Sequence, residues 1–286
     1  MAITVNTNIP SLTAQKSLNN ATSKMNTAME RMTTGLKINS SKDDAAGMAV
    51  ANKLDYKISS LNVAQSNGQM GASMLDTAEG VLNVINDNLV RIRDLTEQAA
   101  NGTYGTDAMT AIETEVQARM DEITRLAESS EFNGKILFNP ADDNGIDKPI
   151  KLQVGINHGS ESVIELKADL FKDAAASTIL KVTGGNVASK YDSDDTARAF
   201  LENIDKALED ITSRTTLLGG YQQRILSAMD AAGVMETNLT SAKSLIEDAD
   251  IAEESSNYIK QQILQQTSAS LLATANQAPS IALNLV

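Results

Sequence analysis

The chain has 286 residues, of which 42% are hydrophobic and only 3% aromatic, with neither tryptophan nor cysteine. Burial must therefore come from small aliphatic side chains, which suit the seams between helices, and disulfide or thiol chemistry is excluded. The formal net charge of -13 disfavours binding to nucleic acids, and no stretch approaches the roughly 18 apolar residues of a membrane span.

The first predicted helix begins after Pro10, with Ser11 or Thr13 as its cap, and is interrupted from Gly35 onward. Its apolar residues alternate at spacings of four and three, with Thr22 filling one position, which is the pattern of a coiled-coil seam. These residues are Leu18, Met25, Met29, Met32 and Leu36. No basic segment followed by an apolar run precedes them, so no cleavable secretory signal is predicted.

The longest seam runs from Leu61 to Ala99. Mostly apolar or small residues recur there at alternating steps of four and three, with charged and amide side chains between them. The members are Leu61, Ala64, Gly68, Gly71, Leu75, Ala78, Leu82, Ile85, Leu89, Ile92, Thr96 and Ala99, and the frame extends back through Lys57 and Leu54. A start signal at Ser41 and a stop at Asn101-Gly102 bound one long coiled-coil helix.

A third helix is expected after Thr106 and Asp107, its candidate caps, with Arg119 as the one polar member of its seam. The apolar members of that seam are Met109, Ile112, Val116, Ile123 and Leu126. Asn133-Gly134 then predicts a turn.

The apolar period changes between residues 136 and 170. Alternating Ile150, Leu152 and Val154 precede a polar loop, and a second apolar segment, Val163 to Leu166, follows it. This pattern predicts a β-hairpin. Residues 174–195 show no clear period and are expected to form a connector or a small flexible excursion.

The helical seam returns at Ala197 and continues to Ile246, where acidic residues break it. A last helix, expected to end at Pro279, carries Ile259, Ile263, Leu264, Leu271 and Leu272. Because a coiled-coil helix cannot bury its stripe alone, the N-terminal seam is predicted to pair with the C-terminal one. The predicted fold is mainly α, a long coiled-coil-like helical bundle rod with a β-hairpin region and paired terminal helices.

Several long blocks resemble bacterial flagellin in the same order along the chain. They are TNIPSLTAQKSL at 7–18 and the segments 31–54, 75–103, 129–138, 152–160, 241–255 and 262–279. Only about 139–149 and 167–196 lie outside the resemblance. The chain departs from the family at Thr267-Ser268, where Ala-Gly is frequent, and at Asn284-Leu285-Val286, which lacks the usual terminal arginine.

The resemblance implies a homopolymer, the extracellular filament of the bacterial flagellum, which serves motility. It implies export through the flagellar type III apparatus, with an export chaperone, a filament cap and hook-junction proteins as partners. Residues 1–44 with 248–286 are expected to form an inner-tube domain, and residues 45–247 a helical rod with the hairpin. A short connector at about 167–196 stands in place of the variable outer domains.

The self-assembly seam is predicted to lie on the two terminal helices. Its members are Leu18, Met25, Met29, Met32, Leu36, Ile259, Ile263, Leu264, Leu271 and Leu272. We expect Ala2 to about Asp44, and Asp248 to Val286, to be mobile in the monomer and to become helical when neighbouring subunits supply burial.

The resemblance also suggests a receptor contact at Arg91, Leu95 and Glu115. These residues match positions that contact the flagellin-sensing Toll-like receptor of animal hosts, and Arg91 and an exposed Leu95 would share a helix face. The alternative is that this face serves subunit packing. Val90 and Glu97 differ from the residues usual there.

No catalytic, cofactor or metal site is predicted. Asp43 and Asp44 have no His or Cys nearby in the sequence and are expected to cap a helix, and His158 lies alone in a polar loop. Two alternatives to the filament subunit are a hook–filament junction protein of the same family and a surface hydrolase that uses clustered carboxylates.

Overall fold

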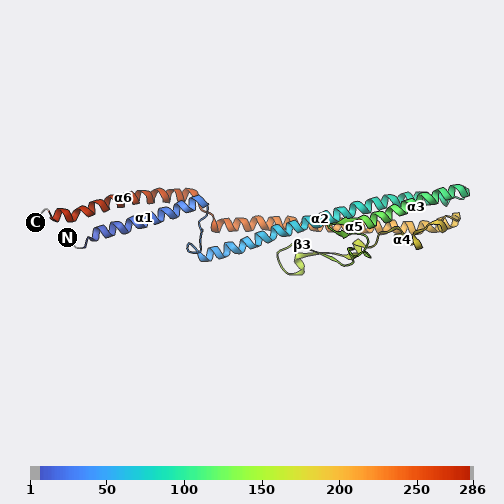
Figure 1. The fold of residues 1–286 in the computed structure, drawn as a ribbon, viewed down its shortest axis with the longest axis horizontal. Coiled ribbons are helices and arrows are strands. Elements are labelled where there is room, and N and C mark those ends of the chain that lie inside the picture. Colours follow the sequence, from blue (N-terminus) through green and yellow to red (C-terminus); the bar gives the residue numbers. More distant parts are fainter. Residues whose placement is uncertain (1–6, 284–286) are drawn as a thin grey trace. The chain divides into compact units, whose positions relative to one another are not determined.

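The computed structural model describes residues 7–283, so Ala2 and the tail Asn284-Leu285-Val286 lie outside the described residues. The chain separates into two units. The chain-end unit holds the residues up to Ile58 and those from Thr237 onward, and the central unit is Ser59–Glu236. The predicted class is confirmed: the fold is mainly α, with two small two-stranded sheets (Figure 1).

Helices α1 (Ile9–Thr34) and α6 (Ile251–Leu283) lie side by side in the chain-end unit (Figure 1), so the predicted pairing of the terminal helices is confirmed. The cap of α1 is Asn8 rather than Ser11 or Thr13, because the Asn8 side chain accepts a hydrogen bond from the Ser11 N–H at 3.1 Å. Gly35 ends α1 at a φ of 74°, a left-handed conformation that glycine adopts without strain.

The expected end of the last helix at Pro279 is wrong, since α6 continues to Leu283. The segments that leave α1 and enter α6 are joined by backbone hydrogen bonds. Lys37 N–H donates to the Glu247 carbonyl at 2.6 Å, and Ala249 N–H donates to the Gly35 carbonyl at 2.9 Å.

Helix α2 (Ala45–Ala99) is capped by Asp44, whose carboxylate accepts from the N–H groups of Ala46 and Gly47 at 3.0 and 2.9 Å. Every predicted seam residue from Leu61 to Ala99 is buried, which confirms that seam. The backward extension is wrong at Lys57, which is exposed, because the inward face in the chain-end unit runs through Ala51 instead.

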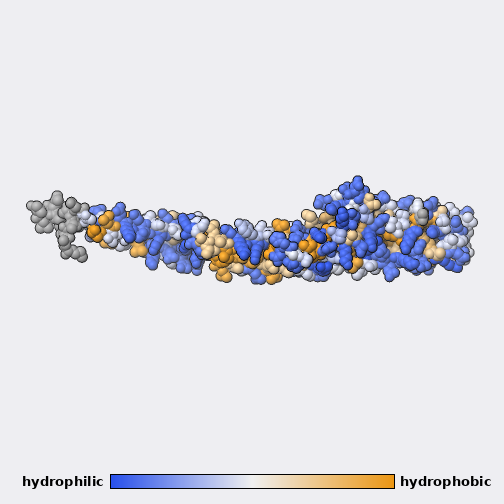
Figure 2. Space-filling view, turned by 90° about the horizontal axis from the view of Figure 1, so that it is seen from below, coloured by the Kyte–Doolittle hydropathy of each residue, from blue (hydrophilic) through white to orange (hydrophobic). Residues whose placement is uncertain are grey.

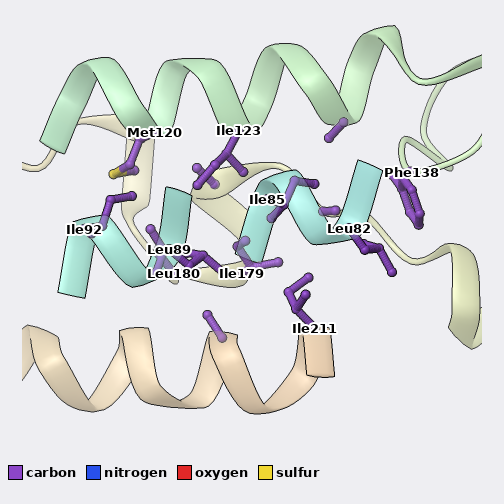
Figure 3. Close-up of a cluster of buried hydrophobic side chains, with 14 of the residues drawn as sticks. Leu82, Ile85, Leu89, Ile92, Met120, Ile123, Phe138, Ile179, Leu180 and Ile211 are labelled. Carbon is purple, nitrogen blue, oxygen red and sulfur yellow. The ribbon is translucent and has the colours of Figure 1, made fainter. Parts of the chain in front are cut away.

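Helix α5 (Asp194–Glu247) and helix α3 (Thr106–Ser129) flank α2 in the central unit. Figure 3 shows the core between them, where side chains of all three helices meet. Its members include Leu82, Ile85, Leu89, Ile92, Met120, Ile123, Phe138, Leu180 and Ile211, each at most 1% exposed.

Two expectations for α3 are wrong. Its N-cap is Gly105, without a side-chain cap, rather than Thr106 or Asp107. Met120, not Arg119, occupies the seam position, and the Arg119 side chain remains 41% exposed beside Glu115.

Strands β3 (Ile150–Gln153) and β4 (Val163–Leu166) form the predicted antiparallel hairpin, with Ile150 opposite Leu166. A smaller hairpin joins β1 (Glu131–Phe132) to β2 (Lys135–Ile136). Its turn residues Asn133 and Gly134 have φ angles of 50° and 80°, as a tight Asn-Gly hairpin turn requires.

The connector is not a flexible excursion. It forms short 3-10 turns at Ala168–Phe171, Thr183–Gly185 and Ala188–Lys190, and the one-turn helix α4 (Ala176–Ile179). The side chains of Ala174, Leu180, Val187 and Tyr191 are buried against the helices. Such turns have no long apolar period, and this is why the sequence pattern gave no sign of their packing.

Candidate functional site

The described residues contain no group of three or more His, Cys, Asp or Glu side chains that could hold a metal ion. His158 is exposed. Hydrogen bonds from Ser40 lower the pKa of Asp43, while Asp44 caps α2, so both carboxylates act within a local turn. None of the described helices is long and apolar enough to cross a membrane.

A hollow of about 1030 Å³ lies between α3 and the connector. Its lining includes Glu113, Gln117 and Asp121. The Gln117 amide is engaged with the backbone, since it donates to the Gly185 carbonyl at 2.9 Å and accepts from the Val187 N–H at 3.2 Å. We therefore interpret the polar side chain of Gln117 in this hollow as a structural link between α3 and the connector.

The face of α6 that contacts α1 is polar or small rather than apolar. Glu254 and Ser268 are buried on it, and Leu272 is half-buried. The buried and half-buried residues of this face follow one another at steps of four and three. They are Glu254, Tyr258, Gln261, Gln265, Ser268, Leu272 and Ala275. The partner face on α1 buries only Ala21 and Ala28.

Polar contacts join the two helices along their length and fix an antiparallel register. The Arg31 guanidinium lies 2.9 Å from the Glu254 carboxylate, and Gln265 Nε2 donates to Thr22 Oγ1 at 3.0 Å. Near the chain ends, Asn8 Nδ2 donates to the Ala275 carbonyl at 2.8 Å.

Besides Ile251 at its first position, α6 has four large apolar side chains that are exposed among its described residues, and we call these four the outward row. They are Ile259, Ile263, Leu264 and Leu271, with exposed fractions of 44–57%. In the space-filling view, hydrophobic residues lie on the surface of the chain-end unit among hydrophilic ones (Figure 2). On α1, Met29 is also exposed, together with Ile9 and Leu12, which the sequence analysis did not single out.

The structure thus separates the predicted assembly residues into two groups. Leu18, Met25, Met32, Leu36 and Leu272 are half-buried within the single chain, whereas the outward row and Met29 are not covered by it. Sequence reasoning assigned the apolar residues of the last helix to one row. The separate four-three row of polar and small residues was the signal that could have identified the face against α1.

The predicted receptor residues are only partly brought together on the surface. Arg91 Nε and Nη2 both lie 3.0 Å from Glu115 Oε1, and the two side chains are 44% and 39% exposed. The expectation of an exposed Leu95 is wrong: this side chain is 3% exposed, because it faces the core of the central unit.

Comparisons with known proteins identify the family. A family model described as the bacterial flagellin N-terminal helical region matches residues 5–142, and one described as the C-terminal helical region matches residues 201–286. A flagellin of Xenorhabdus nematophila is 36% identical over 318 residues, with 100% of both chains covered.

Solved structures agree on the architecture. The crystal structure of Bacillus cereus flagellin has 27% identity and a TM-score of 0.50, covering 62% of this chain and 94% of that one. A putative flagellar hook-associated protein from Vibrio parahaemolyticus shares the fold alone, at 18% identity and a TM-score of 0.59, covering 72% of this chain and 99% of that one. The chain therefore belongs to the bacterial flagellins, the structural subunits of the flagellar filament, as a short form without a large outer domain.

Proposed function

We propose that the outward row and Met29 are the self-assembly surface through which copies of this chain bind one another in the filament. The observation that supports this is the division of α6 into a polar or small row that meets α1 and an apolar row that the chain itself leaves exposed. Full burial of such a side chain stabilises by about 1.5–3 kcal/mol, so roughly 1 kcal/mol per residue remains to be gained on assembly.

Seeded polymerisation tests the proposal. Ile263→Gln combined with Leu271→Gln should raise the critical concentration for filament growth by about tenfold or more, since about 1.4 kcal/mol corresponds to tenfold. Gln266→Ala, at an exposed polar position of the same helix, is the matched control and should assemble as the unmodified chain does. Filaments of the double variant that grow at the unmodified concentration would contradict the proposal, provided that circular dichroism shows equal helicity of the monomers.

The wider family role follows from the same proposal. The chain is exported through the flagellar type III apparatus to an extracellular filament, with an export chaperone, a filament cap and hook-junction proteins as partners. It acts as a structural protein and not as an enzyme. Within it, residues 1–44 with 248–286 form the inner-tube domain, and residues 45–247 form the surrounding helical layer.

A hook–filament junction protein is the second candidate, because a hook-associated protein shares the fold. A junction protein would not extend into long polymers. Electron microscopy of the purified chain on filament seeds therefore distinguishes the two, and growth beyond the seed supports the filament subunit.

We further propose that Arg91 and Glu115 contribute to recognition by the flagellin-sensing Toll-like receptor, with Leu95 supporting the helix from within. The exposed ion pair between Arg91 and Glu115 is the feature that a partner could contact. Reporter cells that respond equally to the depolymerised chain and to its Arg91→Ala variant would contradict this assignment.

A further inference from the structure

Pro279 lies inside α6, and a proline has no N–H group to donate. In an α-helix the carbonyl of residue i accepts from the N–H of residue i+4, so the carbonyl of Ala275 lacks its regular donor. An unpaired carbonyl that is partly withdrawn from water costs free energy. The structure supplies the missing donor from the other end of the chain.

That donor is the side-chain amide of Asn8, whose Nδ2 lies 2.8 Å from the Ala275 carbonyl oxygen. The same amide caps α1, because its Oδ1 accepts from the Ser11 N–H at 3.1 Å. Both polar atoms of the Asn8 amide are thus hydrogen-bonded: the oxygen accepts from α1, and the nitrogen donates to α6. An adjacent contact, from Ser11 Oγ to Asn276 Oδ1 at 2.7 Å, continues the junction.

Two other polar contacts, Arg31 with Glu254 and Gln265 with Thr22, hold the helix pair farther from the chain ends, but the packing of its small residues distinguishes one register from another only weakly. On α1, small residues recur at intervals of seven as Ala14, Ala21 and Ala28, and on α6 Ser268 and Ala275 are also seven apart. A slip of seven residues would place small side chains against small side chains again. Such repeated packing specifies register weakly, and a polar contact at one position is a known means of fixing it.

We propose that Asn8 is a positioning residue that sets the register of α1 against α6 at the chain ends, by donating to the Ala275 carbonyl, whose own i+4 donor Pro279 removes. In a slipped register Asn8 would face a carbonyl that already accepts from its own helix, and the Ala275 carbonyl would be left without a donor. The register in turn decides where the outward row stands relative to α1. The role in assembly rests on the proposed function as a filament subunit.

Asn8→Asp tests the donor separately from the cap. Aspartate keeps an oxygen that accepts from Ser11 N–H and is favourable at a helix N-terminus, but it presents an oxygen instead of an N–H to the Ala275 carbonyl. Loss of one such hydrogen bond typically changes an equilibrium constant by about tenfold. Asn8→Asp should therefore raise the critical concentration for seeded growth about tenfold, whereas a residue that only caps α1 would tolerate the change.

Pro279→Ala is the control background in which Asn8→Asp is tested again, because alanine restores the N–H that can reach the Ala275 carbonyl. When Pro279→Ala is also present, we expect Asn8→Asp to raise the critical concentration for seeded growth by no more than about twofold. Equal growth of Asn8→Asp and the unmodified chain would overturn the proposal, and so would an equal defect with and without Pro279→Ala. Failure of the unmodified chain to polymerise would instead contradict the proposed function, so the two failures are distinguishable.

Discussion

The Tyr191 side chain shows how a single residue holds the connector in the core. Its hydroxyl lies 2.6 Å from Thr96 Oγ1 on α2, and its ring meets Phe200 of α5 edge-on, with ring centroids 6.2 Å apart. Thr96 Oγ1 also donates to the Ile92 carbonyl at 2.7 Å. The Tyr191 hydroxyl therefore donates to Thr96 and completes a buried polar chain that joins connector and helix.

Burial raises the pKa of Tyr191 to about 12, from an ordinary value of 10.0. In the unfolded chain the hydroxyl loses its proton near pH 10, so between pH 10 and pH 12 the folded state binds more protons than the unfolded one. The free energy of unfolding must then fall as pH rises through this window, by on the order of 2 kcal/mol from this group.

Chemical denaturation at a series of pH values measures this fall. Tyr191→Phe should reduce the dependence on pH between 10 and 12, while lowering stability at pH 7 through loss of the bond to Thr96. Tyr104→Phe, at an exposed position, is the control and should leave the profile as it is in the unmodified chain. An unchanged profile for Tyr191→Phe would show that the hydroxyl is not held neutral in the folded state.

At the scale of elements, the glycines of the long helices have opposite roles. Gly71 on α2 faces the hairpin, and a Cβ built there would lie 2.5 Å from Leu152 Cδ1 and within 3.4 Å of two further atoms of that side chain. Gly220 lies inside α5, where a Cβ would meet no atom within 4 Å. The first glycine permits close packing, whereas the second only adds backbone freedom to the unfolded chain.

Alanine at these two positions should therefore change stability in opposite directions. Gly220→Ala should raise the free energy of unfolding by about 0.5–1 kcal/mol, because it removes conformational freedom of the unfolded chain at a helical position. Gly71→Ala should lower it by about 1–3 kcal/mol, since either the Leu152 side chain or the hairpin that carries it must shift. Thermal unfolding followed by circular dichroism measures both, and a stabilised Gly71→Ala variant would show that the hairpin adapts without cost.

The same scale shows what the sequence could predict and what it could not. The seam from Leu61 to Ala99 and the hairpin at Ile150 follow from apolar periods of 3.5 and 2, which act over many residues and were read correctly. The continuation of α6 through Pro279 could not be read locally, because its compensating donor, Asn8, lies 267 residues away in the sequence. The burial of Leu95, by contrast, has a local signal, because it lies three residues after Ile92 and four before Ala99 of the predicted seam; the error came from the resemblance, which implied a surface position.

Over the whole molecule, the two units differ in how much apolar surface they bury. The central unit encloses side chains such as Phe138, Phe171 and Phe200, each at most 1% exposed. The pairing of α1 with α6 fully buries two alanines and leaves larger apolar side chains such as Met25 and Leu272 only half-buried, and polar contacts join the two helices. Apolar burial is the main favourable term in folding, so the helix pair has little to offset the entropy of ordering its two helices.

We therefore propose that α1 and α6 are ordered only transiently in the monomer and become stable when other subunits cover the outward row, as coupled folding and binding requires. Trypsin at limiting concentration tests this, because Lys16, Lys24 and Lys260 lie on these helices and Arg119 lies in the central unit. In the monomer, cleavage at the three lysines should precede cleavage at Arg119, and in the filament the lysines should become protected. Mass spectrometry of the fragments identifies each cleavage site. Monomers whose terminal lysines resist trypsin as long as Arg119 does would show that the helix pair is stable alone, and the outward row would then associate as a preformed surface.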